Sequence, residues 1–245
     1  MGEIVGLYSE CLSLDDHRDR QGRRLLAQVL RASLDTVSQL SRCFFRWQMN
    51  VQVLERPKVS LQNNLEEHLE LFGRLSNLSA PVEQAAHLIA TALSRGHKLL
   101  LCGNGGSAAD SQHLAAEFTG RFVKDRRPLA AMALSTDSSA LTCIANDYSF
   151  DDVFYRQVIA LGRPGDCLLA ISTSGNSRNV IRAAEAARSA GMRTIGLLGR
   201  DGGALLDLCH VSIVVPSTST ARVQEAHIFI GHTLCSLVEQ ALNLV

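Results

Sequence analysis

Five short apolar runs, separated by segments with helical spacing, dominate the sequence from about residue 60 onward. The runs cover 98–102, 129–134, 167–171, 194–198 and 211–215. Continuous apolar runs of this length are typical of parallel strands that are buried on both faces. The helical segments are 61–76, 82–95, 108–120, 138–144, 152–160, 180–190 and 221–243, with Pro81 placed to begin the second of them. Alternating strands and helices predict an α/β domain: a doubly wound, five-stranded parallel sheet flanked by helices, with ligands at the carboxyl ends of the strands.

Residues 1–56 do not follow this rhythm. They contain Arg-rich polar stretches, a plausible helix at 24–47 and the only tryptophan of the chain, but no chemical motif. We expect an N-terminal extension here, helical or poorly ordered, ahead of a domain spanning 57–245. The extension is either a helical arm used in assembly or the result of a misplaced gene start, because Met49 lies just ahead of the domain pattern.

Charge and cysteine content exclude several classes of protein. The chain has 245 residues with 24 basic and 24 acidic side chains, so it lacks the footprint of a protein that binds nucleic acid or an anionic membrane. Its seven cysteines show no CxxC spacing, which predicts free thiols in a reducing compartment. No apolar run reaches membrane-spanning length, and no signal-peptide pattern is present. We therefore predict a cytoplasmic protein without nucleic-acid or membrane partners.

The loop after the third predicted strand is rich in hydroxyls. It reads Ser-Thr-Ser-Gly-Asn-Ser over 172–177 and opens onto a predicted helix. Free backbone N–H groups and the positive end of the helix dipole favour an anion at such a corner, and hydroxyls add neutral donors. A single Ser or Thr is a good helix N-cap anywhere, but four hydroxyls in six positions favour a phosphate carried by a small molecule. The candidate phosphate ligands are Ser172, Thr173, Ser174 and Ser177.

A second loop, Gly103-Asn104-Gly105-Gly106-Ser107, follows the first predicted strand. Its spacing is neither the dinucleotide GxGxxG pattern nor the P-loop pattern, and no acidic residue closes the next strand to hold a ribose. We interpret it as a sugar-phosphate loop in which Asn104 and Ser107 bind hydroxyls or phosphate. A plain tight turn between strand and helix is the alternative.

The helix after this loop carries His113 and Glu117 four residues apart on one face, and Arg121 continues the spacing. A base that removes a proton next to a carbonyl is a carboxylate or a histidine, so Glu117 is a candidate. The His/Glu pair also suits a divalent metal, although a solvated helix edge has the same composition.

Two further places supply polar candidates. Gln224 and His232 of the last helix are eight residues apart, about 80° around the axis, and could reach a ligand from one side. Asn146 and Asp147 end an apolar stretch and either border the same cleft or form an ordinary turn.

Together these residues resemble the sugar-isomerase (SIS) family, and within it the phosphoheptose isomerases. The resemblance covers about 61–245, and seven motifs carry it: CGNGGS at 102–107, HLAAEFTGR at 113–121, AND at 145–147, LGRPGD at 161–166, ISTSGNS at 171–177, GRDGG at 199–203 and RVQEAH at 222–227 followed by His232. It implies a flavodoxin-like SIS domain that converts sedoheptulose 7-phosphate to D-glycero-D-manno-heptose 7-phosphate through an enediol. The extension at the N-terminus departs from the usual family chain.

The resemblance also implies residue roles. Glu117 matches the catalytic base and His232 its acid–base partner. His113, Glu117, Gln224 and His232 match residues that bind zinc in several members, with one Zn²⁺ per subunit. Ser172, Thr173, Ser174 and Ser177 match the phosphate site, and the sugar is lined by Asn104, Gly105, Gly106, Ser107, Glu117, Arg121, Asn146, Asp147 and Gln224. Family members are typically homotetramers with active sites between subunits.

Two alternatives stay open at this point. One SIS branch is a non-catalytic tetramer that binds the DnaA replication initiator, but that branch lacks the pair matching Glu117 and His232. Other SIS isomerases and regulators usually carry additional CBS or DNA-binding modules, for which this sequence shows no pattern.

Overall fold

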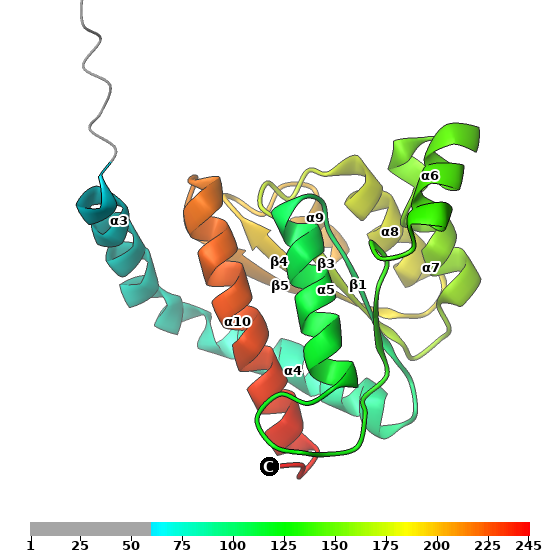
Figure 1. Cartoon of the computed structure of the whole chain (residues 1–245), viewed down its shortest axis with the longest axis horizontal. Helices are drawn as coiled ribbons and strands as arrows, with labels where there is room; N and C mark the ends of the chain where they lie inside the picture. Colours follow the sequence, from blue (N-terminus) through cyan, green and yellow to red (C-terminus); the bar gives the residue numbers. More distant parts are fainter. Residues whose placement is uncertain (1–59) are drawn as a thin grey trace, which may run out of the picture. The chain divides into compact units, whose positions relative to one another are not determined.

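The structure, a computed structural model, describes residues 60–245, which form one compact unit. Its five strands form one parallel sheet in the order β2-β1-β3-β4-β5 (Figure 1). The strands are β1 (Leu99–Cys102), β2 (Ala131–Ala133), β3 (Cys167–Ser172), β4 (Arg193–Gly199) and β5 (Val211–Val215). The predicted fold class is confirmed. The predictions for the extension, including the helix at 24–47 and Met49 as a start, lie outside the described residues.

Eight α-helices and two 3-10 turns of the described residues surround the sheet. They are α3 (Leu61–Arg74), η1 (Leu75–Leu78), α4 (Ser79–Ser94), α5 (Gly106–Thr119), α6 (Ser138–Asp147), η2 (Phe150–Asp152), α7 (Tyr155–Leu161), α8 (Arg178–Ser189), α9 (Leu205–Leu208) and α10 (Thr220–Ala241). Within residues 60–245, no helix is both long and apolar enough to cross a membrane.

Alternate residues of each buried strand build two separate cores, because side chains of a strand point to opposite faces. Leu99 and Leu101 of β1 pack with the apolar faces of α4, α5 and α10. Leu100 and Cys102 pack on the opposite side with α7, α8 and α9. The sheet is therefore a middle layer with both faces buried, as its continuous apolar runs predict.

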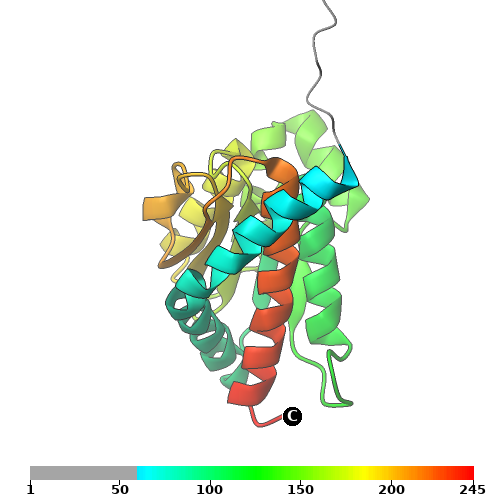
Figure 2. The same ribbon diagram turned by 90° about the vertical axis from the view of Figure 1, so that its left-hand side faces the viewer.

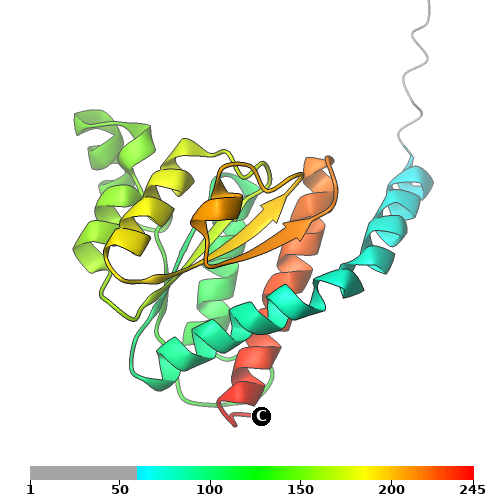
Figure 3. The same cartoon turned by 180° about the vertical axis from the view of Figure 1, so that it is seen from behind.

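The helices on the first face are packed closely around α10. Figure 2 shows α3 crossing the N-terminal half of α10, where Arg222 donates to the carbonyl of Asn64 and His68 Nδ1 lies 2.8 Å from a carboxylate oxygen of Glu225. The view from behind in Figure 3 shows α4 crossing the C-terminal half of the same helix. The last helix is thus held along its whole length.

One local prediction is wrong, and two further details were not predicted. Pro81 is the third residue of α4, not the first, because the break falls in the 3-10 turn before Ser79. Proline is tolerated there because the first four N–H groups of a helix have no intrahelical partner. Asn146 and Asp147 belong to the last turn of α6 and not to a loop. The short helix α9 gave no signal in the sequence, since four residues carry no periodicity.

The strand order creates a switch point between β1 and β3. β1 has β2 on one side and β3 on the other, and the chain leaves β1 toward one face through α5 and leaves β3 toward the other through α8. In sheets of this order, ligands bind where the two connections diverge, outside the carboxyl ends of the strands. The glycine loop and the hydroxyl-rich loop flank this point.

Candidate active site

A pair of asparagines joins the two loops across the switch point. The side-chain amides of Asn104, in the glycine loop, and Asn179, in the first turn of α8, each donate to the other's oxygen at 2.8 Å. Asn179 is buried. Asn104 was predicted as a sugar ligand, and the structure gives it a bracing contact as well. Asn179 was missed, although its place in the first turn after the hydroxyl-rich loop is a usable signal.

In the hydroxyl-rich loop, residues 172–177, some hydroxyls bond within the loop and others do not. Ser172 is buried, and its Oγ accepts the Gly175 N–H at 3.1 Å and lies 3.1 Å from Ser177 Oγ. Ser174 Oγ accepts the Asn176 N–H at 3.2 Å. The hydroxyl of Thr173 has no hydrogen-bond partner within residues 60–245. Ser177 precedes α8 without capping it, so the first N–H groups of that helix are left for an anion.

A neighbouring loop, residues 199–205, packs against the hydroxyl-rich loop. A Cβ atom at Gly175, where φ is +68°, would lie 1.8 Å from the carbonyl oxygen of Gly202. Asn176 Oδ1 accepts the Ala204 N–H at 3.0 Å, and the Gly175 carbonyl accepts the Leu205 N–H at 3.1 Å. The loop shape is therefore set by backbone contacts that only glycine permits at position 175.

The other half of the site is the seam between α5 and α10, two helices that both begin at the carboxyl edge of the sheet and lie side by side (Figure 1). At their N-terminal ends the amide of Gln224 lies over Gly106, where an added Cβ would be 2.4 Å from its Nε2. Half way along, Gly231 lies against Leu114, and an added Cβ would be 2.6 Å from the leucine side chain. Small residues thus allow the two helices to approach closely.

This approach brings three predicted site residues together. His113 Nε2 of α5 lies 2.9 Å from His232 Nε2 of α10 and 3.5 Å from Glu117 Oε1. The ring of Phe122 stacks on His232 with centroids 5.5 Å apart. A carboxylate and an imidazole from helices more than 100 residues apart in sequence therefore meet in one place. Glu117 is 23% exposed, which leaves its carboxylate accessible to a substrate.

The same three side chains fit a small divalent metal. Their ligand atoms all lie within 4.8 Å of one another. Tetrahedral Zn²⁺ with N and O ligands at about 2.0–2.1 Å needs ligand atoms about 3.3 Å apart. The two separations that involve His113, 2.9 and 3.5 Å, lie on either side of that value. The fourth predicted ligand, Gln224, lies at the N-terminal end of the seam beside Gly106.

Three residues predicted to line the sugar lie outside the group of His113, Glu117 and His232. Arg121 does not continue the stripe of His113 and Glu117, because α5 ends at Thr119 and the backbone turns at Gly120. Asn146 donates to Asp147 at 2.8 Å, and this bond is the main reason that the pKa of Asp147 lies below its usual value, with Cys143 adding to it. Within residues 60–245, none of these three side chains bonds to the His113, Glu117 and His232 group.

Asp110 is a residue that the sequence analysis missed. It lies one turn before His113 on α5, and its Oδ2 is buried without a hydrogen-bond partner among the described residues. Burial raises the pKa of Asp110 to about 6, against a lowering effect of His113. The spacing of three from His113 is the signal that could have found it.

Two further histidines of the described residues, His227 and His210, have structural hydrogen-bond partners. His227 is fully buried in α10, and its Nε2 lies 3.0 Å from the Leu198 carbonyl oxygen of β4. Desolvation lowers the pKa of His227 to about 4, so the ring is neutral and its Nε2–H donates to that carbonyl. His210 Nδ1 lies 2.8 Å from the Thr194 hydroxyl.

The class of protein follows from the family model of the SIS domain, which matches residues 65–199, and the parallel sheet with a hydroxyl-rich loop at its switch point agrees with it. The phosphoheptose isomerase of Campylobacter concisus is 51% identical over 186 residues, which are 76% of this chain and 98% of that one. The chain belongs to the phosphoheptose isomerase family and is a sugar-phosphate isomerase.

Solved structures agree with this assignment. The phosphoheptose isomerase GmhA of Neisseria gonorrhoeae is 47% identical with a TM-score of 0.69, over 74% of this chain and all of that one. The enzyme of Francisella tularensis is 37% identical with a TM-score of 0.71, over 73% and 96% of the two chains. The alternative of a non-catalytic partner of a replication initiator is not supported by these relatives.

Proposed function

We propose that this chain interconverts sedoheptulose 7-phosphate and D-glycero-D-manno-heptose 7-phosphate through an enediol. The observation that carries the proposal is the meeting of Glu117 and His232 at His113, because an aldose–ketose isomerase needs one base for carbon and one acid–base group for oxygen. The curated relatives in Campylobacter concisus and Rhodospirillum rubrum are named phosphoheptose isomerases, which supports the seven-carbon substrate.

In the forward direction Glu117 takes a proton from C1 of the ketose, and the electron pair forms the C1–C2 double bond of the enediol. His232 gives a proton to the oxygen on C2 and accepts the proton from the oxygen on C1. Glu117 then returns its proton to C2, which leaves an aldehyde at C1 and a hydroxyl at C2. No proton is gained or lost over the cycle, so the reaction needs no co-reactant.

The hydroxyl-rich loop would hold the remote phosphate. Its free donors are the Thr173 hydroxyl and the first N–H groups of α8, with Ser174 and Ser177 beside them. Binding energy from the phosphate orients carbons 1 and 2 against the acid–base pair. Asn104 can brace Asn179 and still contact the sugar, because each amide oxygen and nitrogen has a second hydrogen-bonding position.

We propose the other sugar-lining residues on the resemblance to the family. They are Gly105, Gly106, Ser107, Arg121, Asn146, Asp147 and Gln224.

His113, Glu117 and His232 would also hold Zn²⁺, with Gln224 as a fourth ligand. A bound zinc ion supplies Lewis-acid polarisation of the substrate carbonyl and fixes the arrangement of these side chains.

An apolar stripe on α3 supports an oligomer. Leu61, Leu65 and Leu69 are 85%, 46% and 60% exposed, and Phe229 of α10 is 50% exposed nearby on the same face of the sheet. We propose that this stripe is buried in a homotetramer with active sites between subunits. Sedimentation velocity of the full chain tests this, with Leu69→Glu expected to shift the tetramer toward smaller species. A wild-type monomer with full activity would contradict it.

The direct test is incubation of the pure protein with sedoheptulose 7-phosphate in D₂O, followed by NMR. We expect an aldoheptose product and deuterium at the exchanged carbon, with slower turnover after chelation that added Zn²⁺ restores. Absence of both product and deuterium exchange in the zinc-loaded protein would overturn the proposed activity.

A further inference from the structure

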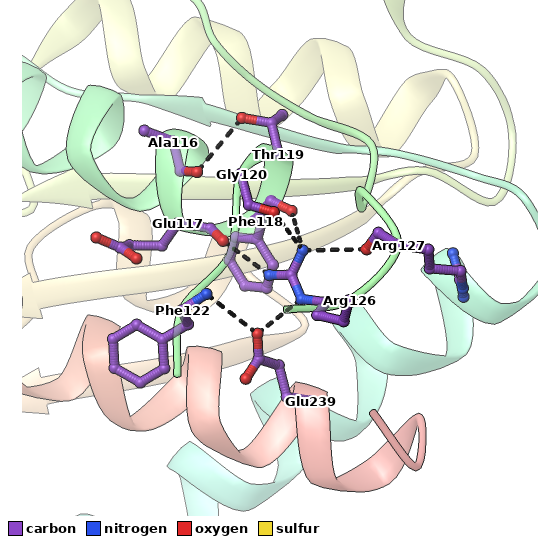
Figure 4. Close-up of polar contacts among 9 residues, drawn as sticks. All are labelled: Ala116, Glu117, Phe118, Thr119, Gly120, Phe122, Arg126, Arg127 and Glu239. Atoms are coloured by element: carbon purple, nitrogen blue, oxygen red, sulfur yellow. Dashed lines mark hydrogen bonds and ion pairs between the residues drawn. The ribbon is translucent and has the colours of Figure 1, made fainter. Parts of the chain in front are cut away.

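A buried ion pair lies below the catalytic pair at the C-terminal end of α5. Arg126, in the loop between α5 and β2, donates from Nε to Glu239 Oε1 of α10 at 2.7 Å (Figure 4). The two side chains are only 2% and 1% exposed. Because a buried ion pair adds little net stability once its desolvation is counted, burial alone does not explain its presence.

The remaining donors of Arg126 close the end of α5. Its Nη2 donates to the Glu117 carbonyl at 2.8 Å, and its Nη1 donates to the Phe118 carbonyl at 2.8 Å and the Gly120 carbonyl at 3.1 Å. These carbonyls have no partner within the helix, and the negative end of the helix dipole favours a cation. The guanidinium therefore holds the backbone of the residue that carries the proposed base.

Glu239 is linked through Phe122 to His232, the second residue of the catalytic pair. It lies seven residues after His232, two turns along the same face of α10. Its Oε1 also accepts the backbone N–H of Phe122 at 3.3 Å, and the ring of Phe122 stacks on His232. Figure 4 shows Arg126 and Phe122 converging on this carboxylate from the loop, with Glu117 above.

We propose that Arg126 and Glu239 are positioning residues for the isomerase reaction: they set the placement of α5 against α10 and thereby of Glu117 against His232. The inference rests on the proposed function. Neither residue touches the reacting atoms. Their effect is transmitted through the Glu117 backbone and the Phe122 ring, so a small displacement lowers the rate of the chemical step more than substrate binding.

Three variants separate positioning from stability. Arg126→Met removes the contacts to the Glu117 and Phe118 carbonyls, and we expect kcat to fall at least about tenfold with KM within about threefold of the wild type. Glu239→Gln keeps an oxygen that accepts from Arg126 and Phe122, so it should be less stable but retain kcat within about threefold. Glu239→Met loses that acceptor and should behave like Arg126→Met.

The matched control is the ion pair of Lys98 and Asp166 at the opposite, amino-terminal edge of the sheet. Lys98 Nζ lies 2.5 Å from Asp166 Oδ2, and the aspartate is 1% exposed. Asp166→Asn should lower the melting temperature and leave kcat unchanged. Each variant is assayed well below its own melting temperature.

Hydrogen exchange of the full chain gives a readout that does not need turnover. In Arg126→Met we expect amides 117–122 to exchange at least about tenfold faster, with β1 and β3 unchanged, because the carbonyl contacts that close α5 are lost. A normal kcat in Arg126→Met, a kcat loss in Asp166→Asn, or unchanged exchange at 117–122 would each overturn the positioning role. A wild type without isomerase activity overturns the proposed function instead, and the exchange result still decides whether the ion pair holds this segment.

Discussion

The hydroxyl-rich loop and the α5–α10 seam are two halves of one site that are built in opposite ways. The loop is local: Ser172, Gly175 and Ser177 bond to one another within six residues. The seam is distant: His113 and His232 are 119 positions apart and meet only because two helices pack together. The proposed recognition of a phosphate therefore depends on a short segment, whereas the proposed acid–base chemistry depends on the whole fold.

This difference explains why the two halves should fail in different ways. A change in the loop alters the hydroxyls proposed to bind the phosphate and leaves the helices in place. A change in the seam alters the distance between two reactive groups, to which rate is more sensitive than binding. The following predictions separate these two outcomes.

The largest effect is expected from Glu117→Gln. Removing the base should lower kcat by at least about 1,000-fold, because general acid–base catalysis contributes factors of about 100 to 10,000. Binding of the sugar phosphate, measured by calorimetry, should stay within about threefold, since the loop is intact. Glu185→Gln, an exposed carboxylate of α8, is the control and should be fully active. Near-normal turnover of Glu117→Gln would dismiss Glu117 as the base.

Gly175→Ala tests how rigidly the loop is supported. We expect a loss of about 4 kcal/mol or more in the free energy of unfolding, because the new Cβ would meet the Gly202 carbonyl at 1.8 Å. Gly105→Ala is the matched control: its φ is also positive, at +56°, but no atom lies within 4 Å of an added Cβ. Backbone strain alone should cost about 1–3 kcal/mol there, because a ψ of −121° at this φ is rare for any residue with a Cβ. Equal losses in urea unfolding would show that the contact with Gly202 does not shape the loop.

The stability of the fold should be sensitive to acid through His227, which joins α10 to β4. Its pKa of about 4 lies below the value of about 6.5 in the unfolded chain. The unfolded state therefore binds more protons between these values, and stability is complete above about pH 7 and falls as the pH drops toward 4. The loss attributable to His227 is on the order of 3 kcal/mol.

His227→Gln should remove this slope. The raised pKa of Asp110, about 6, acts with the opposite sign over part of the same range, so the difference between variant and wild type is the quantity to measure by urea unfolding at several pH values. An identical slope in the two proteins would mean that His227 is not the group responsible.

The smallest effect is expected in the loop itself. Thr173→Val removes a hydroxyl without a partner among the described residues, so stability should not change. KM for the sugar phosphate should rise about tenfold, the value of one hydrogen bond to a charged group. Thr142→Val, on the exposed face of α6, is the control with an unchanged KM. If KM stays constant in Thr173→Val, the phosphate lies elsewhere.

Much of the fold and part of the candidate site could be predicted from the sequence, and the reason differs between elements. The strand at 211–215 has the bounds that its apolar run predicts, since Pro216 and Ser217 directly follow the run. The hydroxyl-rich loop was recognisable because its residues are adjacent. The errors at Pro81 and Arg121 are errors of helix ends, where a single backbone turn decides and periodicity carries no information.

The sequence by itself determined the order of strands and helices and the clustering of hydroxyls in the loop at 172–177, because each is a property of neighbouring residues. Only the tertiary structure decided that Asn104 pairs with Asn179, that His113 contacts His232, and that Arg126 closes α5 against Glu239. These contacts join residues 75 to 119 positions apart. The His113 and Arg126 contacts form because α5 and α10, with small residues at their crossing, approach closely on one face of the sheet, and the Asn104–Asn179 pair forms because β1 and β3 are neighbours in the sheet. No local pattern contains these distances.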